Sequence, residues 1–233
     1  MADANPANTI CPTRPTWVRW RIEMLLMAFS AMCHFNRISM SVAGSEKLIK
    51  DYGIDPTVMG WVYSSYLIAY TVCMTPGGWL IDSWGPRRAF LFLGFGSAIF
   101  VGMTGLAGIC FSSATLLVFA YFVIRPLTGI VNAPMHPGAA RVVSFWIPTP
   151  ARSMANGLIT GAALIGIAST YKVFGFLMDH FQWSFAFVIA GMATGILAVL
   201  WFFYATNKPR EHKSVNSSEL KLIETDKAID SER

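Results

Sequence analysis

Apolar residues in this chain gather into long, nearly uninterrupted stretches that polar turns separate. A helix needs roughly 20 residues to cross a hydrocarbon core of about 30 Å, and six stretches reach that length. They cover residues 22–43, 58–80, 89–111, 114–136, 154–178 and 183–206. Turn-forming pairs such as Asp55-Pro56 and Gly85-Pro86 lie between them. The pattern therefore predicts six transmembrane helices.

The apolar character is even along each stretch and does not alternate from one residue to the next. In lipid only helices and closed β-barrels satisfy the backbone hydrogen bonds, and the strands of a barrel alternate in polarity. We therefore expect an all-α membrane protein with a helical bundle over residues 22–206. Residues 1–21 would form a segment before the bundle, and the polar residues 207–233 a linker or tail after it.

The composition indicates the same class of protein. Hydrophobic residues make up 54% of the 233 residues and charged residues only 13%, whereas soluble domains carry about 25% charged residues. The net charge is +5, but Lys and Arg are spread over short connections and the tail without a continuous basic patch. The composition therefore excludes a soluble domain and argues against nucleic-acid binding.

Basic residues flank the apolar stretches on one side of the predicted membrane. They lie before the first stretch, in alternate connections and after the sixth, as Arg14, Arg19, Arg21, Arg87, Arg88, Arg141, Arg152, Lys208, Arg210 and Lys213. The connections on the other side hold only Lys47 and Lys50, next to acidic residues. Because cytoplasmic loops are enriched in Lys and Arg, we expect both termini in the cytoplasm, at a bacterial inner membrane.

Two arginines fall inside the apolar stretches, where a charge is costly. Arg37 lies about 22 Å along the first stretch at 1.5 Å per residue, and Arg125 lies near the middle of the fourth. Arginine at a bilayer centre costs about 2.5–3.5 kcal/mol on insertion scales, so such residues normally face a bundle interior or a wet cavity. A second interpretation stays open for Arg37, whose off-centre depth also permits its head to extend toward the membrane surface.

Polar residues share helical faces with these arginines. The fourth stretch places Gly129, Asn132 and His136 on one face with Arg125, at successive spacings of four, three and four. On the second stretch Tyr63, Tyr66 and Tyr70 are spaced three and four apart, which suits either interfacial packing or a cavity wall. Guanidinium groups bind carboxylate or phosphate with two hydrogen bonds. The residues together predict a site for a small anion that has hydrogen-bonding groups.

The turn between the second and third stretches carries Gly78, Asp82, Gly85, Arg87 and Arg88. This spacing resembles the signature between the second and third helices of the major facilitator superfamily, with a proline at position 86 in place of the usual basic residue. The resemblance implies that the acid and the basic residues latch the cytoplasmic face in one state of alternating access.

Three further stretches resemble the anion:cation symporter family within that superfamily, which includes sugar-acid carriers. They are Phe35–Ala43, Arg125–Gly129 with Asn132-Ala133-Pro134 and Pro137, and Asn207–His212. The resemblance implies the N-terminal half of a twelve-helix carrier, in which Arg37 anchors the substrate carboxylate. It also implies a substrate site that includes Tyr63, Tyr70, Arg125 and Asn132.

The sequence departs from that family at two acids that usually carry the coupled proton. One lies just before the first-helix arginine and the other seven residues after the fourth-helix arginine; here the positions are Asn36 and Asn132, whose amides do not titrate. The carrier would then be an exchanger or facilitator, or coupling would pass to a histidine, His34 or His136. Asparagine at these positions could equally hydrogen-bond the substrate.

We therefore expect secondary transport of a small organic anion, a sugar acid or other carboxylate, by alternating access. The sequence ends after one six-helix half and a linker, so the expected partners are a second six-helix half, the anion and the lipid bilayer. Two alternatives stay open: an organophosphate/phosphate antiporter, and a non-transporting truncated half or assembly partner. No P-loop, nucleophile elbow or metal-ligand cluster occurs in the sequence, so we expect no enzymatic activity, cofactor or metal.

Overall fold

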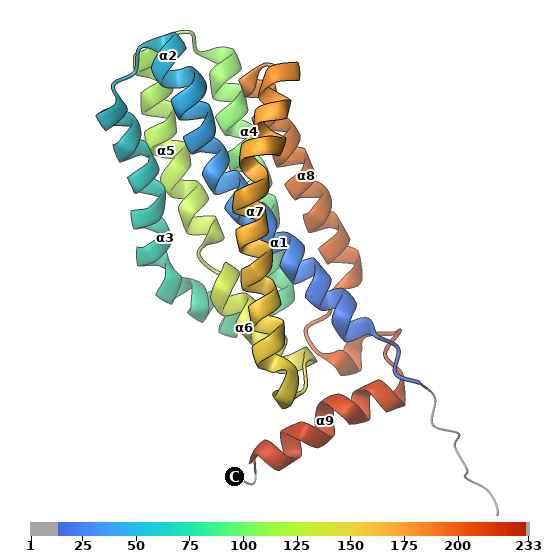
Figure 1. Ribbon diagram of the computed structural model, residues 1–233. Helices are drawn as coiled ribbons and strands as arrows, with labels where there is room; N and C mark the ends of the chain where they lie inside the picture. The colour runs from blue at the N-terminus through green and yellow to red at the C-terminus, as the bar shows by residue number, and fades with distance from the viewer. Residues whose placement is uncertain (1–13, 232–233) are drawn as a thin grey trace, which may run out of the picture.

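Long helices run side by side through the computed structural model, which describes residues 14–231 and their side chains up to residue 224 (Figure 1). The α-helices are α1 (Val18–Ala43), α2 (Ile49–Tyr52), α3 (Pro56–Trp84), α4 (Pro86–Cys110), α5 (Ala114–Asn132), α6 (Met135–Trp146), α7 (Arg152–His180), α8 (Trp183–Tyr204) and α9 (Ser217–Ser231). Three short turns of other helix types, η1 (Gly44–Leu48), η2 (Thr149–Ala151) and η3 (Pro209–Glu211), connect them. Residues 1–13 of the predicted N-terminal segment lie outside the described residues.

The predicted all-α membrane bundle is confirmed, and the chain is a multi-pass membrane protein. Within the described residues four helical segments are long and apolar enough to cross a bilayer, namely Pro86–Cys110, Ala114–Trp146, Thr149–His180 and Trp183–Tyr204. The helices α1 and α3 are of similar length, at 26 and 29 residues, but they are less apolar than those four segments. In Figure 1 α1 lies among the other helices and α3 at one edge of the bundle, and together they supply most of the polar residues described below.

The rods pack in pairs, α4 with α8, α1 with α7 and α3 with α5. The α1–α7 crossing depends on Gly166, because a Cβ atom there would lie 2.2 Å from the backbone oxygen of Ala31. Close backbone approach at small residues is the usual way in which helices associate in lipid, where the hydrophobic effect does not drive them together. The crossing therefore fixes the rotation of α1, and with it the direction in which the polar residues of α1 point.

Two apolar clusters fill the bundle, one toward each end. Tyr121, Phe174 and Phe187 belong to the cluster near α2, and Trp146 and Trp201 to the cluster near α9. Buried polar residues lie where the clusters meet, including Ser30, Asn36, Ser97, Thr128, Asn132, Thr170 and Thr194. Buried polar groups are costly unless they are hydrogen-bonded, and each of these side chains makes at least one hydrogen bond, to a backbone oxygen or to another side chain.

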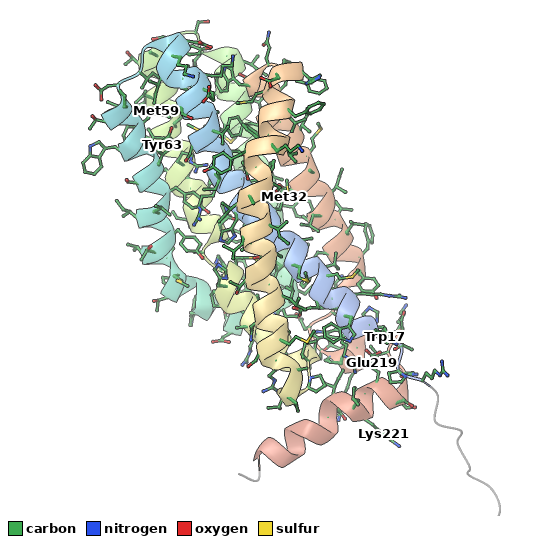
Figure 2. All side chains as sticks on the ribbon, in the orientation of Figure 1. Trp17, Met32, Met59, Tyr63, Glu219 and Lys221 are labelled. Carbon is green, nitrogen blue, oxygen red and sulfur yellow. The ribbon has the colours of Figure 1, made fainter. Side chains whose placement is uncertain are left out.

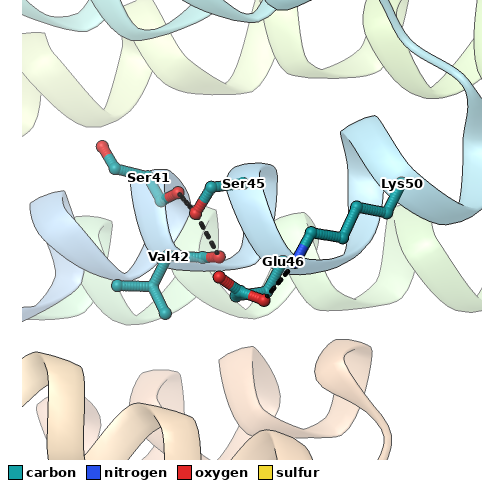
Figure 3. A network of polar contacts seen from close by, with 5 residues as sticks. All are labelled: Ser41, Val42, Ser45, Glu46 and Lys50. Carbon is teal, nitrogen blue, oxygen red and sulfur yellow. Dashed lines mark hydrogen bonds and ion pairs between the residues drawn. The ribbon is translucent and has the colours of Figure 1, made fainter.

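Beyond the apolar part of α1 the chain continues through η1 into α2, and Figure 3 shows the polar contacts there. The hydroxyl of Ser45 donates to the backbone oxygens of Ser41 and Val42 at 3.0 and 3.2 Å. Lys50 and Glu46 form an ion pair with an N–O distance of 2.7 Å, in which both side chains are more than half exposed. Such an exposed pair contributes only about 0–1 kcal/mol, so it marks a water-facing end and contributes little to stability.

The polar tail carries a helix that docks on the bundle. The helix α9 lies across one end of the bundle, where the described chain also begins (Figure 1). Its residue Glu219 is fully buried and accepts hydrogen bonds from the backbone N–H groups of Val18 and Arg19, at 3.3 and 3.1 Å, and from the hydroxyl of Thr16. Figure 2 shows Glu219 beside Trp17, at the start of α1. The tail thus supplies the N-cap that the sequence around Trp17 lacks.

Candidate functional site

A polar cavity of about 220 Å³ lies in the middle of the bundle, between α1, α3, α5 and α6. Its wall is made by Cys33, His34, Arg37, Tyr66, Tyr70, Met74, Asn132, Met135 and His136. A larger hollow of about 450 Å³ lies between α4 and α5, but its lining consists almost wholly of apolar groups. A binding site needs a few convergent polar groups to orient its ligand, so the smaller cavity is the candidate site.

Arg37 lies in the wall between two hollows. It lines the cavity and also a second space of about 210 Å³, which Ser41, Tyr63 and Arg125 share with it. The residue is half-buried, with Cys33 one turn before it and Ser41 one turn after it on the same face of α1. This placement favours the interior position of Arg37 over the alternative in which its head extends to the membrane surface.

Arg125 is buried to 3% exposure, yet it has no acidic partner within the described residues. One guanidinium nitrogen, Nη2, donates to the backbone oxygen of Arg37 at 3.3 Å. The guanidinium carbon lies 4.8 Å from the ring centre of Tyr66, a cation–π contact worth about 0.5–2 kcal/mol. The Nε atom has no hydrogen-bond partner in the part of the chain that is described. The charge is therefore only partly compensated, and it adds positive potential beside Arg37.

Gly129 brings Arg125 and Tyr66 together. A Cβ atom at Gly129 would lie 2.4 Å from the backbone oxygen of Tyr66 and 3.1 Å from the backbone nitrogen of Tyr70. The absence of a side chain therefore lets α5 approach α3 closely, one turn from Arg125. On the predicted face of α5, Gly129 thus packs against α3 and Arg125 carries the charge.

The tyrosine stripe on α3 divides between the two hollows. Tyr66 and Tyr70 line the cavity with their rings stacked at 6.1 Å between centres and 9° between planes. Tyr63 lines the second space, and its hydroxyl lies where a side chain on Gly44 would be. Within the described residues that hydroxyl has no hydrogen-bond partner. The structure therefore places Tyr70 next to Tyr66 in the cavity, and Tyr63 beside Arg125 in the second space.

The two asparagines at the positions of the usual acids differ in their surroundings. Asn132 borders the cavity, but its Oδ1 accepts from Ser97 at 2.6 Å and from Cys33 at 3.1 Å, and its Nδ2 donates to the Thr128 backbone oxygen at 3.0 Å. Its amide thereby links α1, α4 and α5 and has little capacity left for a ligand.

Asn36 does not line the cavity. It is buried and points toward α8, where its Nδ2 donates to the hydroxyl of Thr194 at 2.9 Å. Its Oδ1 has no hydrogen-bond partner within the described residues. The structure therefore separates Asn36 from the residues with which the sequence grouped it, because consecutive residues of a helix point about 100° apart.

His34 and His136 face each other at the cavity wall, from α1 and α6. Their ring centres are 5.6 Å apart, and the ring planes make an angle of 64°. The Nδ1 atom of His34 lies 2.9 Å from the backbone oxygen of Ser30. Because a carbonyl oxygen only accepts, this contact assigns the proton to Nδ1 and leaves Nε2 as the acceptor nitrogen of the neutral ring.

The predicted gating turn lies at the end of the bundle where α9 docks. Gly85 joins α3 to α4 with a φ of 80°, a conformation that glycine adopts readily. Asp82 pairs with Arg141 of α6 at 3.6 Å, while Arg88 is exposed and Gly78 lies in the last part of α3.

Arg87 of the same turn contacts α8 and the connection after it. Its Nη2 donates to the backbone oxygen of Phe202 at 2.7 Å, and its backbone N–H donates to Asn207 Oδ1 at 3.0 Å. The indole N–H of Trp201 in turn donates to the Arg87 backbone oxygen at 3.1 Å. The turn is therefore fixed to α8. Its acid, Asp82, pairs with Arg141, whereas Arg87 binds the end of α8.

Sequence reasoning left out three residues of the cavity wall, namely Cys33, Met74 and Met135, and it placed Tyr66 in the tyrosine stripe without naming it as a substrate contact. Spacing could have found Cys33, because it lies four residues before Arg37. Nothing in the local pattern indicates the two methionines, since apolar residues occupy most neighbouring positions.

Comparison with known proteins agrees with the family resemblance of the sequence motifs. The model of the Major Facilitator Superfamily matches residues 25–229. The probable galactarate/D-glucarate transporter of Bacillus subtilis (strain 168) is 33% identical over 96% of this chain and 47% of that protein. Its namesake from Escherichia coli (strain K12) is 32% identical over 89% of this chain and 45% of that protein. The D-galactonate transporter of Escherichia coli O6:H1 is 28% identical over 94% and 48%. This chain spans about half the length of the curated relatives it matches.

Proposed function

Because this chain belongs to the Major Facilitator Superfamily, we propose that it carries a small organic anion, a sugar acid, across the membrane as one half of a larger carrier. Family membership and the transporter names of its relatives point to a protein that is not an enzyme. The observation that carries the proposal is a polar cavity that contains Arg37 and no carboxylate side chain among its described lining residues.

The cavity suits a carboxylate with hydroxyl groups. A guanidinium binds a carboxylate with two parallel hydrogen bonds, and Arg37 is the cation in the cavity wall. Tyr70, His34 and His136 supply groups that donate to or accept from sugar hydroxyls. The buried charge of Arg125 behind Arg37 strengthens the attraction for an anion, because no acidic side chain of the described residues neutralises it.

A second six-helix half would complete the site. Pockets that enclose drug-sized ligands have volumes of about 300–1,000 Å³, and this cavity is smaller, at about 220 Å³. Carriers of this architecture bind substrate between two related halves near the middle of the membrane. The cavity would then be one wall of the full site, and rocking of the halves would expose Arg37 to each side in turn.

The orientation proposed from the basic residues puts both termini and α9 in the cytoplasm, at a bacterial inner membrane. The gating turn and the start of α1 lie at the same end of the bundle as α9, which supports one common side for all three (Figure 1). We propose that the turn around Asp82 and Arg87 takes part in closing the cytoplasmic side. To test this orientation, Arg88 is replaced by cysteine. In right-side-out vesicles we expect that cysteine to be inaccessible to a membrane-impermeant thiol reagent and to be labelled only after permeabilisation.

Substrate binding tests the proposed function directly. The melting temperature of the purified chain is measured with a panel of aldarates, aldonates, sugar phosphates and inorganic phosphate. We expect stabilisation by sugar acids, and its loss in Arg37→Ala. Lys172→Ala is the matched control, because it removes an equal charge from an exposed position of α7. Stabilisation by sugar phosphates alone would favour the phosphate antiporter, and no response to any anion would favour a non-transporting half.

A further inference from the structure

The two facing histidines give the cavity a second group that can become positive. His34 lies three residues before Arg37 on α1, so the two side chains share one face of the helix. His136 comes from α6, and its ring centre is 5.6 Å from that of His34. Both rings are half-buried and both line the cavity. A proton on either ring would therefore lie beside the ligand space and close to Arg37.

The hydrogen bonds leave nitrogen atoms available for that proton. The Ser30 carbonyl fixes the hydrogen of His34 on Nδ1, so Nε2 of the neutral ring carries a lone pair. His136 has no hydrogen bond within the described residues and keeps one acceptor nitrogen in either tautomer. The pair can take up one proton without breaking any contact of the described chain.

The surroundings decide when a proton would bind. The other titratable groups facing the pair are Arg37 and Cys33 of α1, and Tyr66 and Tyr70 of α3, with Arg125 of α5 behind them. None is a carboxylate, and the Cys33 thiol is engaged with Asn132. In the empty cavity a charged histidine would thus face guanidinium groups and no counter-ion. A bound ligand changes this balance through the negative charge that it brings.

We propose that the His34–His136 pair takes up one proton when a doubly charged acid occupies the cavity, and thereby sets the preference between doubly and singly charged substrates. This inference rests on the proposed function of the cavity. A monocarboxylate satisfies Arg37 and leaves no charge for the histidines. A dicarboxylate brings a second negative charge that a neutral pair cannot match and a protonated pair can. Binding of proton and dianion therefore favour each other, since a coupling free energy acts equally on both ligands.

The proposal predicts a difference between two acids that share one carbon skeleton. Galactarate carries two carboxylates and galactonate one, and both acids are almost fully ionised above about pH 6 because carboxyl groups titrate near 4. Between about pH 8 and pH 6, across the usual range of histidine, galactarate affinity for the chain should rise about tenfold. Galactonate affinity should change by less than about twofold. Calorimetry in buffers of different ionisation enthalpy should detect uptake of about one proton with galactarate alone.

Glutamine variants of the histidines provide the control, because glutamine keeps hydrogen-bonding capacity and loses the titration. His34→Gln and His136→Gln together should abolish the proton uptake and flatten the pH dependence of galactarate affinity. The single variants serve if the double variant does not fold, and each should reduce the uptake. His180→Gln, at an exposed position at the end of α7, should leave it unchanged.

The outcomes separate the two proposals. Galactarate binding with no proton uptake, or with equal uptake in the glutamine variants, overturns the role of the histidine pair and leaves the proposed function standing. Equal pH dependence for galactonate overturns the charge selection. Failure of both acids to bind at any pH overturns the proposed function and this inference together.

Discussion

The guanidinium of Arg125 donates from Nη2 to the backbone oxygen of Arg37 over 3.3 Å. A buried cation on α5 is therefore bonded to the backbone of α1 at the residue that lines both hollows. Since the Arg37 side chain reaches the cavity from that backbone position, a movement of α5 would carry it along. Arg125 has no carboxylate partner among the described residues. Its replacement therefore breaks no ion pair there, and an effect on anion binding can be told apart from an effect on stability.

Arg125→Met should weaken anion binding about tenfold or more and leave the melting temperature unchanged or raised. At an effective dielectric constant of about 20, two unit charges interact by about 4 kcal/mol at 4 Å and by less at longer range, whereas an apolar replacement of buried charges is often neutral or stabilising. Ligand-induced shifts in melting temperature measure both effects in one titration. Arg125→Lys, which keeps the charge, should retain part of the binding. A large loss of stability with intact binding would contradict the electrostatic role.

Gly129→Ala should destabilise the bundle by about 1–3 kcal/mol, the range for overpacking a filled contact. The new Cβ atom would lie 2.4 Å from the Tyr66 backbone oxygen, so α3 and α5 must separate. Thermal unfolding in detergent measures the change. Gly175→Ala is the matched control, because no atom lies within 4 Å of the corresponding Cβ position on α7. Equal effects in the two variants would show that the α3–α5 crossing is not tight.

Glu219→Gln should loosen α9 from the bundle. The carboxylate caps the start of α1 through the Val18 and Arg19 amides, and a negative charge at a helix N-terminus contributes about 0.3–2 kcal/mol. We expect faster trypsin cleavage at Lys213, an exposed residue of the tail. Asp51→Asn removes an equal charge at the far end of the bundle and should leave the rate as in the wild type. Unchanged cleavage in Glu219→Gln would mean that other contacts hold the tail.

Acidification should also release the tail, through His212. Burial lowers the pKa of His212 below its ordinary value, and the Tyr204 carbonyl and Glu219 oppose the shift. The ring packs against Trp146 at 5.8 Å, and Nδ1 accepts from the Ser214 amide at 3.2 Å, which requires an unprotonated Nδ1. The docked state thus binds the proton more weakly than the free tail does. Docking is at full strength above about pH 6.5 and weakens as the pH falls through the lower pKa of the docked state.

Hydrogen exchange of α9 measures this release. The difference in exchange between wild type and His212→Gln is taken at each pH, so that the intrinsic pH dependence of exchange cancels. The wild type should lose protection relative to the variant as the pH falls from about 7.5 to 5.5, the usual range of histidine. A constant difference over that range would assign the docking to groups that do not titrate there.

The class of fold could be predicted from the sequence because the lipid imposes it locally. A stretch of sufficient apolar length has to be helical in lipid wherever it packs, and the six predicted stretches correspond to the six rods of the bundle. The fourth predicted stretch, residues 114–136, ended too early. After a break at Pro134, α6 continues in the direction of α5 from Met135 to Trp146. The positions of Arg37 and Arg125 inside the bundle follow from the same argument about the cost of charge.

The helix α9 was not predicted, because its polar sequence resembles that of a solvated linker. Its position depends on long-range contacts, among them the one from Glu219 to the start of α1, about 200 positions earlier in the chain. Neither segment has a signal of its own for that contact. A helix whose N-cap is supplied by another helix does not need a capping sequence of its own, so its start carries no local signature.

The sequence by itself determined the long helices and the charges that are buried among them. Only the tertiary structure decided that Asn36 turns to Thr194, that Asn132 is held by Ser97 and Cys33, and that the two histidines meet. The physical reason is that periodicity fixes which residues share a face and leaves open which neighbour that face meets. Rotation of each helix is set by close crossings such as those at Gly129 and Gly166, between residues far apart in the chain.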